Sequence, residues 1–344
     1  MNVNAILNRP RRFLALLLPG LMAIPATVEA QASYPTIGTI ERKDPRFDRL
    51  VPPGAKLQQL AEGFDWSEGP VWVPSERALL FSDVPRNEIL EWKEGRGIRV
   101  FLKPSGYTGK PERGGEPGSN GLVLDPTGRL VICQHGDRRV ARREPDGMLT
   151  TLADRYMGKR LNSPNDAVYK SNGDLYFTDP PYGLEGLNDA ATKELKVNGV
   201  YRVSKDGEVT LLTDQLTFPN GLAFSPDEKT LYVANSDPNH AVWMAFDVAA
   251  DGTLGKGRVF FDATDRVKTQ KGLPDGMKVD RQGNLFASGP GGVLVFDPDG
   301  THLGTIQTGQ ATGNCAWGDD GSVLYVSADM YLCRIPLTTK GTGF

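Results

Sequence analysis

Cysteine and histidine are scarce in this chain of 344 residues, which contains three of each. Three cysteines are too few for a disulfide framework, and no Cys-x-x-Cys pair or histidine cluster indicates a structural zinc site. We expect the three cysteines to be buried strand residues: Cys133, Cys315 and Cys333. Cys315 and Cys333 fall in the same repeat, so a disulfide between them is the alternative. The chain also has no Gly-x-Ser-x-Gly sequence, which argues against a serine esterase of the α/β-hydrolase type.

Strong charge and long amphipathic helices are absent as well. The formal net charge is −3 and no basic tract is present, which argues against nucleic acid as a partner. Short strand-like runs are instead separated by turn pairs such as Asp206-Gly207 and Asp299-Gly300. A parallel α/β sheet is disfavoured because it needs helical crossovers between its strands.

The one long apolar run lies at the amino terminus. Three arginines precede FLALLLPGLMAIPA, and small residues follow in VEAQAS. Charged, apolar and cleavable regions in this order are typical of a secretory signal, so residues 1–30 are predicted to be removed and the mature protein to be periplasmic or secreted. A single uncleaved anchor is the alternative, which Pro19 and Pro25 disfavour. No later segment is expected to span a membrane.

A phrase that recurs six times dominates the rest of the chain. Each copy opens with a polar residue, continues into an apolar stretch and ends in a second strand-like run. The opening residues are Glu68, Asn120, Asn165, Asn220, Asp275 and Asn314. Their spacing of roughly 40 to 55 residues is the length of one four-stranded blade. The sequence therefore predicts an all-β fold, a six-bladed β-propeller over residues 55–340, with residues 31–54 as an N-terminal extension.

The predicted ring is closed by an N-terminal strand. A strand-like run precedes each copy of the phrase, and LQQLAEGF takes that place before Glu68, at the start of the predicted domain. We expect this run to be the outermost strand of the last blade, because that pairing removes an open sheet edge.

The opening residues of the phrases define a candidate metal site. Innermost strands converge on the propeller axis, so these residues should meet in one central cup. Four of them supply two carboxylates and two amide carbonyls, and they are Glu68, Asn165, Asn220 and Asp275. Such an all-oxygen set suits one divalent metal ion, calcium first, with zinc, magnesium or manganese as alternatives. Asn-Gly and Asp-Gly pairs are also common turn formers, but that explanation does not apply to the glutamate.

Other polar residues are candidates for contacts with substrate. Asn120 occupies the cup position of its own copy, and His135 follows an apolar strand run in CQHGD. Asp179 and Tyr182 lie in TDPPYG, a loop that its prolines should make rigid. Each residue also has a structural alternative. Asn120 would form a turn, and His135 would be a buried histidine with its hydrogen bonds made inside the protein. Asp179 and Tyr182 would only maintain the structure of their loop.

Four segments together resemble a known family. They are SEGPVW, LNSPNDAVYKSNGDLYFTDPPYGL, FPNGLAFSPDEKTLYVANSD and LPDGMKVDRQGNLFAS, in the order and spacing of that family. The family is that of gluconolactonase, senescence marker protein and luciferin-regenerating enzyme, and FTDPPYGL with CQHGDRRV looks most like its bacterial gluconolactonase branch. The resemblance implies a six-bladed propeller that hydrolyses sugar lactones with a divalent metal ion.

The resemblance also implies roles for single residues. Glu68, Asn220 and Asp275 match metal ligands of the family, and Asp275 matches its proposed general base. Asn165 matches an asparagine that binds either metal or substrate. Ser163 stands where animal relatives carry an arginine that contacts substrate, and Arg160 is a candidate replacement.

These patterns predict an enzyme that opens a sugar lactone to its aldonic acid. A metal ion would polarise the lactone carbonyl while Asp275 takes a proton from the attacking water; alternatively, Asp275 is only a ligand and the metal activates the water. Two other functions stay open: hydrolysis of phosphotriesters or other esters, and a non-catalytic binding module with a structural metal. The insertion PSGYTGKPERGGEPGS would be a lid over the cup or a partner-binding loop.

Overall fold

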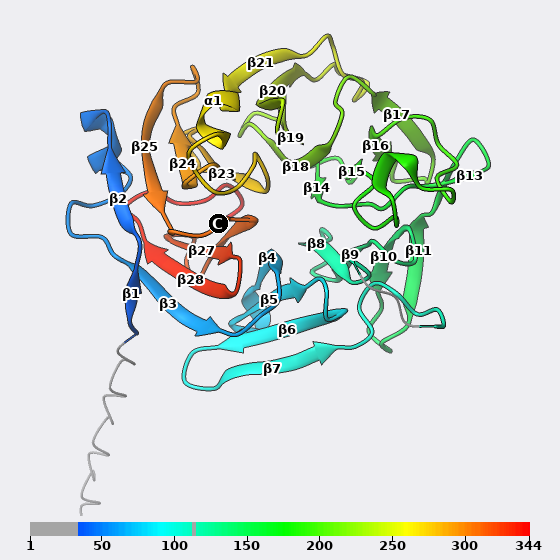
Figure 1. The fold of residues 1–344 in the computed structure, drawn as a ribbon, viewed down its shortest axis with the longest axis horizontal. Coiled ribbons are helices and arrows are strands. Elements are labelled where there is room, and N and C mark those ends of the chain that lie inside the picture. Colours follow the sequence, from blue (N-terminus) through cyan, green and yellow to red (C-terminus); the bar gives the residue numbers. More distant parts are fainter. Residues whose placement is uncertain (1–33, 112–114) are drawn as a thin grey trace, which may run out of the picture. The chain divides into compact units, whose positions relative to one another are not determined.

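The computed structural model describes residues 34–111 and 115–344, and the predicted signal at residues 1–30 lies outside them. Residues 34–344 form one compact unit of six antiparallel sheets arranged in a ring, the six-bladed β-propeller that the repeated phrases predict (Figure 1). Within the described residues no helix is long and apolar enough to cross a membrane.

The first three blades follow one another along the chain, each running from an innermost to an outermost strand. Blade one consists of β4 (Ser67–Val73), β5 (Ala78–Asp83), β6 (Glu88–Lys93) and β7 (Gly97–Leu102). Blade two consists of β8 (Ser119–Leu124), β9 (Leu130–Gln134), β10 (Arg139–Arg143) and β11 (Leu149–Ala153). Blade three consists of β14 (Ala167–Tyr169), β15 (Leu175–Asp179), β16 (Gly199–Val203) and β17 (Val209–Thr213).

The last three blades follow the same plan, and two of them gain strands from the amino-terminal part of the chain. Blade four consists of β18 (Pro219–Phe224), β19 (Thr230–Asp237), β20 (His240–Asp247) and β21 (Arg258–Asp262). Blade five consists of β22 (Met277–Val279), β23 (Leu285–Gly289), β24 (Gly292–Phe296), β25 (His302–Gln307) and β2 (Thr39–Arg42). Blade six consists of β26 (Asn314–Gly318), β27 (Val323–Ala328), β28 (Tyr331–Pro336), β3 (Leu57–Glu62) and β1 (Thr36–Ile37).

The remaining elements are short and lie in the connections. They are the two-stranded ribbon of β12 (Arg155–Tyr156) and β13 (Lys159–Arg160), the 3-10 turns η1 (Pro45–Arg49), η2 (Pro74–Glu76) and η3 (Leu187–Asp189), and the single-turn helix α1 (Thr264–Val267). Helix α1 lies between blades four and five, in a connection that also borders the cavity described below.

The ring is closed between the two ends of the described chain. Strand β3 pairs antiparallel with β28, with Ala61 opposite Leu332, and Figure 1 shows the blue strand beside the red one. This confirms that the N-terminal run closes the ring. The expectation that β3 is the outermost strand is wrong, because β1 pairs with its outer edge. Residues 34–54, expected as an extension, contribute β1 and β2, which add a fifth strand to blades six and five. These added strands cover two outer sheet edges that would otherwise be open.

The hydrophobic core lies between neighbouring blades. Trp72 of blade one stacks on Tyr325 of blade six with ring centroids 5.6 Å apart, and Trp243 of blade four packs against Phe296 of blade five at 5.5 Å. Each strand alternates side chains between its two faces, and both faces of a blade are covered by its neighbours. All three cysteines are buried in these layers as free thiols.

The glycines after the cup residues serve close packing. Gly221 follows Asn220 inside β18, and a Cβ atom at Gly221 would lie 2.4 Å from the backbone oxygen of Asp275 in the next blade. The turn explanation of the Asn220-Gly221 pair is therefore wrong, because the pair lies within a strand. Glycine is needed there because the innermost strands lie too close together for a side chain. In contrast, Gly207 has a φ of 87° between β16 and β17, as its hairpin turn requires.

Candidate active site

The beginnings of the innermost strands surround a cavity of about 430 Å³, which we call the cup. This volume lies in the range of sites for small molecules. Six of the residues predicted from the sequence line it: Glu68, Asn120, Asn165, Tyr182, Asn220 and Asp275. They come from five blades, with Asn165 and Tyr182 both in blade three. All but Tyr182 lie at the beginnings of innermost strands, which converge on one axis.

Glu68 is held in a tightly fitted position at the base of the cup. The residue is 1% exposed, and its Oε2 accepts a hydrogen bond of 2.9 Å from the backbone N–H of Gly69. A Cβ atom on Gly313 would lie 2.1 Å from Glu68 Oε1, so only glycine leaves room for the carboxylate. Burial raises the pKa of Glu68 to about 8, with the negative charges of Asp166 and Glu116 adding to the effect.

Asp275 brings a second carboxylate into the same cavity. Its backbone N–H donates to the Ser288 carbonyl at 2.9 Å, which fixes the residue just before β22. Burial raises the pKa of Asp275 well above its ordinary range, and the charge of Glu68 raises it further. Two desolvated carboxylates that repel each other form a site that a bound cation would stabilise.

The amide of Asn220 is oriented by a serine from the same blade. Asn220 Nδ2 donates to Ser236 Oγ at 3.0 Å, while the Ser236 hydroxyl donates its own proton to the Pro274 carbonyl. A hydroxyl has one proton to donate. Because that proton goes to Pro274, Ser236 can only accept from Asn220, and the Asn220 side-chain oxygen is left for the cup.

Asn165 presents a second amide oxygen. Its Oδ1 atom is buried and has no hydrogen-bond partner among the described residues, while its Nδ2 lies 3.4 Å from His135 Nε2. His135 is fully buried behind the cup lining. Its Nδ1 lies 3.3 Å from Glu116 Oε2, without the alignment of a hydrogen bond. His135 thus lies between a cup residue and a loop carboxylate.

Tyr182 brings an unpaired hydroxyl to the cup. Its ring stacks on Phe218 with centroids 5.8 Å apart, and its buried hydroxyl lies near the Ser236 and Asn220 side chains without an aligned hydrogen bond in the described part of the chain. Burial raises the pKa of Tyr182, so the group is a neutral donor at ordinary pH. Ser163 fixes the loop before it, because its hydroxyl donates to Pro180 and accepts from the Gly183 N–H. An unsatisfied buried donor is suited to a ligand oxygen.

Asp179 and Arg160 do not line the cup. The Asp179 carboxylate is fully buried and accepts hydrogen bonds of 2.8 Å from the backbone N–H groups of Asn162 and Ser163. It therefore holds the loop that leads to Asn165, and the structure favours the loop-supporting alternative for this residue. Arg160 Nη2 donates to the Asp137 carbonyl at 3.2 Å instead of reaching the cavity.

Several lining residues were missed by the sequence analysis. The polar ones are Ser236, Gln270, Glu116 and Thr312, and Trp66, Val267 and Leu273 give the wall an apolar part. Glu116 belongs to the insertion that the sequence marks as a lid or partner loop. Ser236 lies in β19, and the others come from connections between blades, where no repeated pattern shows which side chains turn inward.

The residues present fit a divalent metal ion. Within residues 34–111 and 115–344 no group of three or more histidine, cysteine, aspartate or glutamate side chains is placed to hold a metal. The cup instead combines two carboxylates with amide oxygens, and the unpartnered Oδ1 of Asn165 is one of them. Hard divalent cations take such mixed oxygen sets and complete their shells with water.

Known proteins share both the sequence and the fold. The sequence is 42% identical over 322 residues to a gluconolactonase from Zymomonas mobilis, covering 89% of this chain and 88% of that protein. A pentonolactonase from Haloferax volcanii is 27% identical over 76% of this chain and 80% of its own length. A solved gluconolactonase from Xanthomonas campestris superimposes with a TM-score of 0.78 at 35% identity, covering 90% of this chain and 99% of that one.

The matching family region is the SMP-30/Gluconolactonase/LRE-like region, which aligns with residues 66–329. It begins beside Glu68 and ends in the last blade, so it contains every cup residue named above. The protein therefore belongs to the SMP-30/gluconolactonase/LRE-like family.

Proposed function

We propose that this protein is a metal-dependent hydrolase that opens a sugar lactone, of the gluconolactone type, to the corresponding aldonic acid. The observation that carries the proposal is the meeting of two carboxylates, Glu68 and Asp275, with two amides, Asn165 and Asn220, in one cup of small-molecule size. The 42% identity with a gluconolactonase over most of the chain supports a sugar lactone as substrate.

Glu68, Asp275, Asn165 and Asn220 would hold the metal ion, with calcium as the first candidate because all four donors are oxygens. A divalent ion bound there supplies Lewis-acid polarisation of the lactone carbonyl. The positive charge of the ion would offset the repulsion between Glu68 and Asp275 and so favour the ionised form of both carboxylates.

The chain's own groups supply the remaining steps. Asp275 accepts the proton of the attacking water, since it is the carboxylate that is partly exposed to the cup while Glu68 is 1% exposed. Water adds to the lactone carbonyl carbon, the ring C–O bond breaks, and the ring oxygen leaves as an alcohol after gaining a proton. The unpaired Tyr182 hydroxyl and the Asn120 side chain line the same cavity and bind substrate oxygens.

The decisive experiment measures lactone opening with a pH indicator. Protein stripped with a chelator is titrated separately with calcium, zinc, magnesium and manganese, using gluconolactone as substrate and the melting temperature as a second readout. Turnover restored by one ion is the expected result. A rise in melting temperature without turnover would favour a structural metal in a binding module, and turnover of phosphotriesters alone would assign a different ester as substrate.

Export is a second part of the proposal. It rests on the charged, apolar and small-residue regions of the first 30 residues, in the order that is typical of a secretory signal. Mass spectrometry of the protein from periplasm and cytoplasm tests this point. A mature chain that begins shortly after residue 30 in the periplasm is expected, and an intact amino terminus in the cytoplasm contradicts it.

A further inference from the structure

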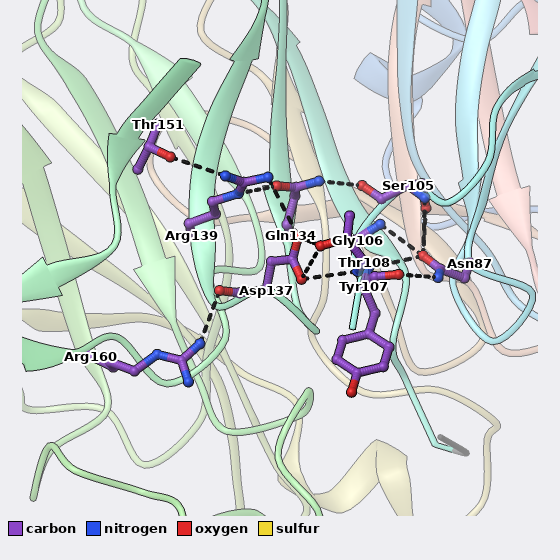
Figure 2. A network of polar contacts seen from close by, with 10 residues as sticks. All are labelled: Asn87, Ser105, Gly106, Tyr107, Thr108, Gln134, Asp137, Arg139, Thr151 and Arg160. Atoms are coloured by element: carbon purple, nitrogen blue, oxygen red, sulfur yellow. Dashed lines mark hydrogen bonds and ion pairs between the residues drawn. The ribbon is translucent and has the colours of Figure 1, made fainter. Parts of the chain in front are cut away.

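The connection between β7 and β8 is firmly attached to the propeller near both of its ends. Figure 2 shows Asn87 Oδ1 accepting hydrogen bonds from the backbone N–H groups of Ser105, Gly106 and Tyr107, at 3.0, 2.8 and 3.1 Å. The Gln134 side chain donates to the Ser105 carbonyl at 2.6 Å (Figure 2). The beginning of this connection is thus fixed to blades one and two.

The end of the connection is fixed by backbone bonds. Gly118 donates to the Val84 carbonyl at 3.0 Å and accepts from the His135 N–H at 3.1 Å, and the Pro117 carbonyl accepts from the Gly136 N–H at 3.1 Å. These bonds place the residue before Pro117, which is Glu116, at the cup. The segment that carries this carboxylate is therefore held in position by the blades beneath it.

The Glu116 side chain reaches the cup but differs from the buried carboxylates. It is 38% exposed, and its Oε2 lies 3.3 Å from His135 Nδ1. Its negative charge also acts on the carboxyl groups of Glu68 and Asp275. No backbone or side-chain donor of the described chain makes an aligned hydrogen bond to it, whereas Glu68 accepts from Gly69. A carboxylate that is partly exposed, lines a cavity and lacks donors can accept hydrogen bonds from a ligand at little desolvation cost.

An aromatic ring lies in an adjoining part of the lining. Val84 joins the two segments, because its N–H donates to the Trp66 carbonyl at 3.2 Å and its carbonyl accepts from Gly118. Trp66 and Glu116 both line the cup. An aromatic side chain and a carboxylate that line one cavity match a sugar ring, which combines C–H faces with hydroxyl donors around its edge.

We propose that Glu116 recognises the hydroxyl groups of the substrate and makes the cup selective for polyhydroxylated lactones over unsubstituted ones. The inference rests on the proposed lactone hydrolysis and deepens it. The carboxylate accepts hydrogen bonds from ring hydroxyls, while the reacting carbonyl lies at the inner residues. A site built to bind hydroxyls loses affinity for a substrate that lacks them, because its polar group is then left unpaired.

The test compares gluconolactone with δ-valerolactone, which has the same ring without hydroxyls, in metal-loaded wild-type, Glu116→Gln and Glu116→Ala proteins. We expect the KM for gluconolactone to rise about 10- to 100-fold in Glu116→Ala, as the loss of charge-assisted hydrogen bonds implies. Glu116→Gln, which keeps one acceptor oxygen, should fall between wild type and Glu116→Ala. The kcat for gluconolactone should change less than about threefold in both variants, and so should the kcat and KM for δ-valerolactone. Where δ-valerolactone is not turned over, its inhibition constant gives the same comparison.

The exposed carboxylate of Glu185 provides a matched control, since it lies outside the cup lining. Glu185→Gln should leave both substrates unaffected. Equal losses for the two lactones in Glu116→Ala, or no loss for either, would overturn the inference. Failure of the proposed function itself is distinct, because wild-type protein would then open neither lactone with any metal.

Discussion

The Ser236 hydroxyl accepts a hydrogen bond from the Asn220 side-chain amide at 3.0 Å and donates to the Pro274 carbonyl. Pro274 directly precedes Asp275, so one hydroxyl links the positions of two proposed metal donors from neighbouring blades. The bond also decides which end of the Asn220 amide faces the cup. Residues that orient ligands in this way commonly matter nearly as much as the ligands.

Replacing Ser236 by alanine should weaken metal binding. Without the acceptor, the Asn220 amide loses its fixed orientation, and we expect the affinity for the activating ion to fall about 10-fold or more. Isothermal titration of the stripped protein with that ion measures the change. Ser322→Ala is the control, because that hydroxyl donates to Asp320 at the surface. Unchanged affinity in Ser236→Ala would show that Asn220 is oriented by other contacts.

Asp275→Asn should abolish turnover and leave the fold intact. The amide has nearly the same shape as the carboxylate but cannot accept a proton from water, so we expect kcat to fall at least about 100-fold. Circular dichroism and the melting temperature establish that the propeller is folded. Activity equal to that of wild type would remove Asp275 from the mechanism.

Gly313→Ala should displace Glu68. The added Cβ would lie 2.1 Å from Glu68 Oε1, and relief of that overlap should cost about 1–3 kcal/mol of the free energy of unfolding as well as most of the activity. Gly54→Ala is a matched control, since a Cβ there meets no atom within 4 Å. Chemical denaturation of both variants measures the difference, and equal stability would mean that the carboxylate moves aside freely.

The closing strand should contribute strongly to stability. Leu57 in β3 is 2% exposed, and Leu57→Ala should cost about 2–5 kcal/mol of the free energy of unfolding, because it leaves a cavity in the core of blade six. Val100 lies in β7, the outermost strand of blade one, and is 52% exposed, so Val100→Ala should change stability by less than about 0.5 kcal/mol. Comparable effects of the two substitutions in urea denaturation would contradict a closed core at β3.

His302 should make the protein sensitive to mild acid. Burial lowers the pKa of His302 from 6.5 to about 4, with the charge of Arg266 contributing, and its Nε2 lies 2.9 Å from the Gly304 carbonyl. The unfolded chain therefore binds a proton more readily than the folded protein between these pH values. The stabilising effect of the neutral ring is complete above pH 6.5 and is lost as the pH falls towards 4.

A comparison of unfolding free energies at pH 7 and pH 4.5 measures this effect. Wild-type protein should lose more stability over that interval than His302→Gln, whose side chain does not titrate. Because other carboxylates titrate in both proteins, the difference between the two slopes is the informative quantity. Parallel slopes would mean that the pKa of His302 is the same in the folded and the unfolded protein, and would contradict the prediction.

Much of the fold was predictable because each blade repeats the same physical requirements. A polar residue, an apolar innermost strand and a hairpin recur in every blade, so their spacing indicated six blades. The unpaired run LQQLAEGF indicated how the ring closes, and β3 confirms it. The role of Gly221 was not visible in the sequence, because the same Asn-Gly pair suits a turn and a crowded axis. Only the distance to Asp275 in the next blade distinguishes them.

The site residues that open each repeat could be predicted from the sequence, whereas lining residues outside that position could not. Glu68, Asn120, Asn165, Asn220 and Asp275 share one position in their blades, so one argument found these five. The sixth opening residue, Asn314, does not line the cup: Gly313 takes the equivalent position, and the Asn314 amide donates to Asp166. Glu116 and Ser236 hold no such position, and contacts between segments distant in sequence bring them to the cup. Asp179 was expected in the TDPPYG loop, but it is the last residue of β15, and its carboxylate holds the backbone of Asn162 and Ser163 in a neighbouring loop.

The pairing of β3 with β28 has a consequence for biosynthesis. Strand β3 leaves the ribosome before the first complete blade and must wait for its partner until almost the entire chain has been made. Glu68 likewise waits for Gly313, beside which its carboxylate finally fits. A nascent chain that stops before the last blade would carry all four proposed metal donors and still lack a finished cup. Complete synthesis of the last blade is therefore a condition for the final position of the Glu68 carboxylate.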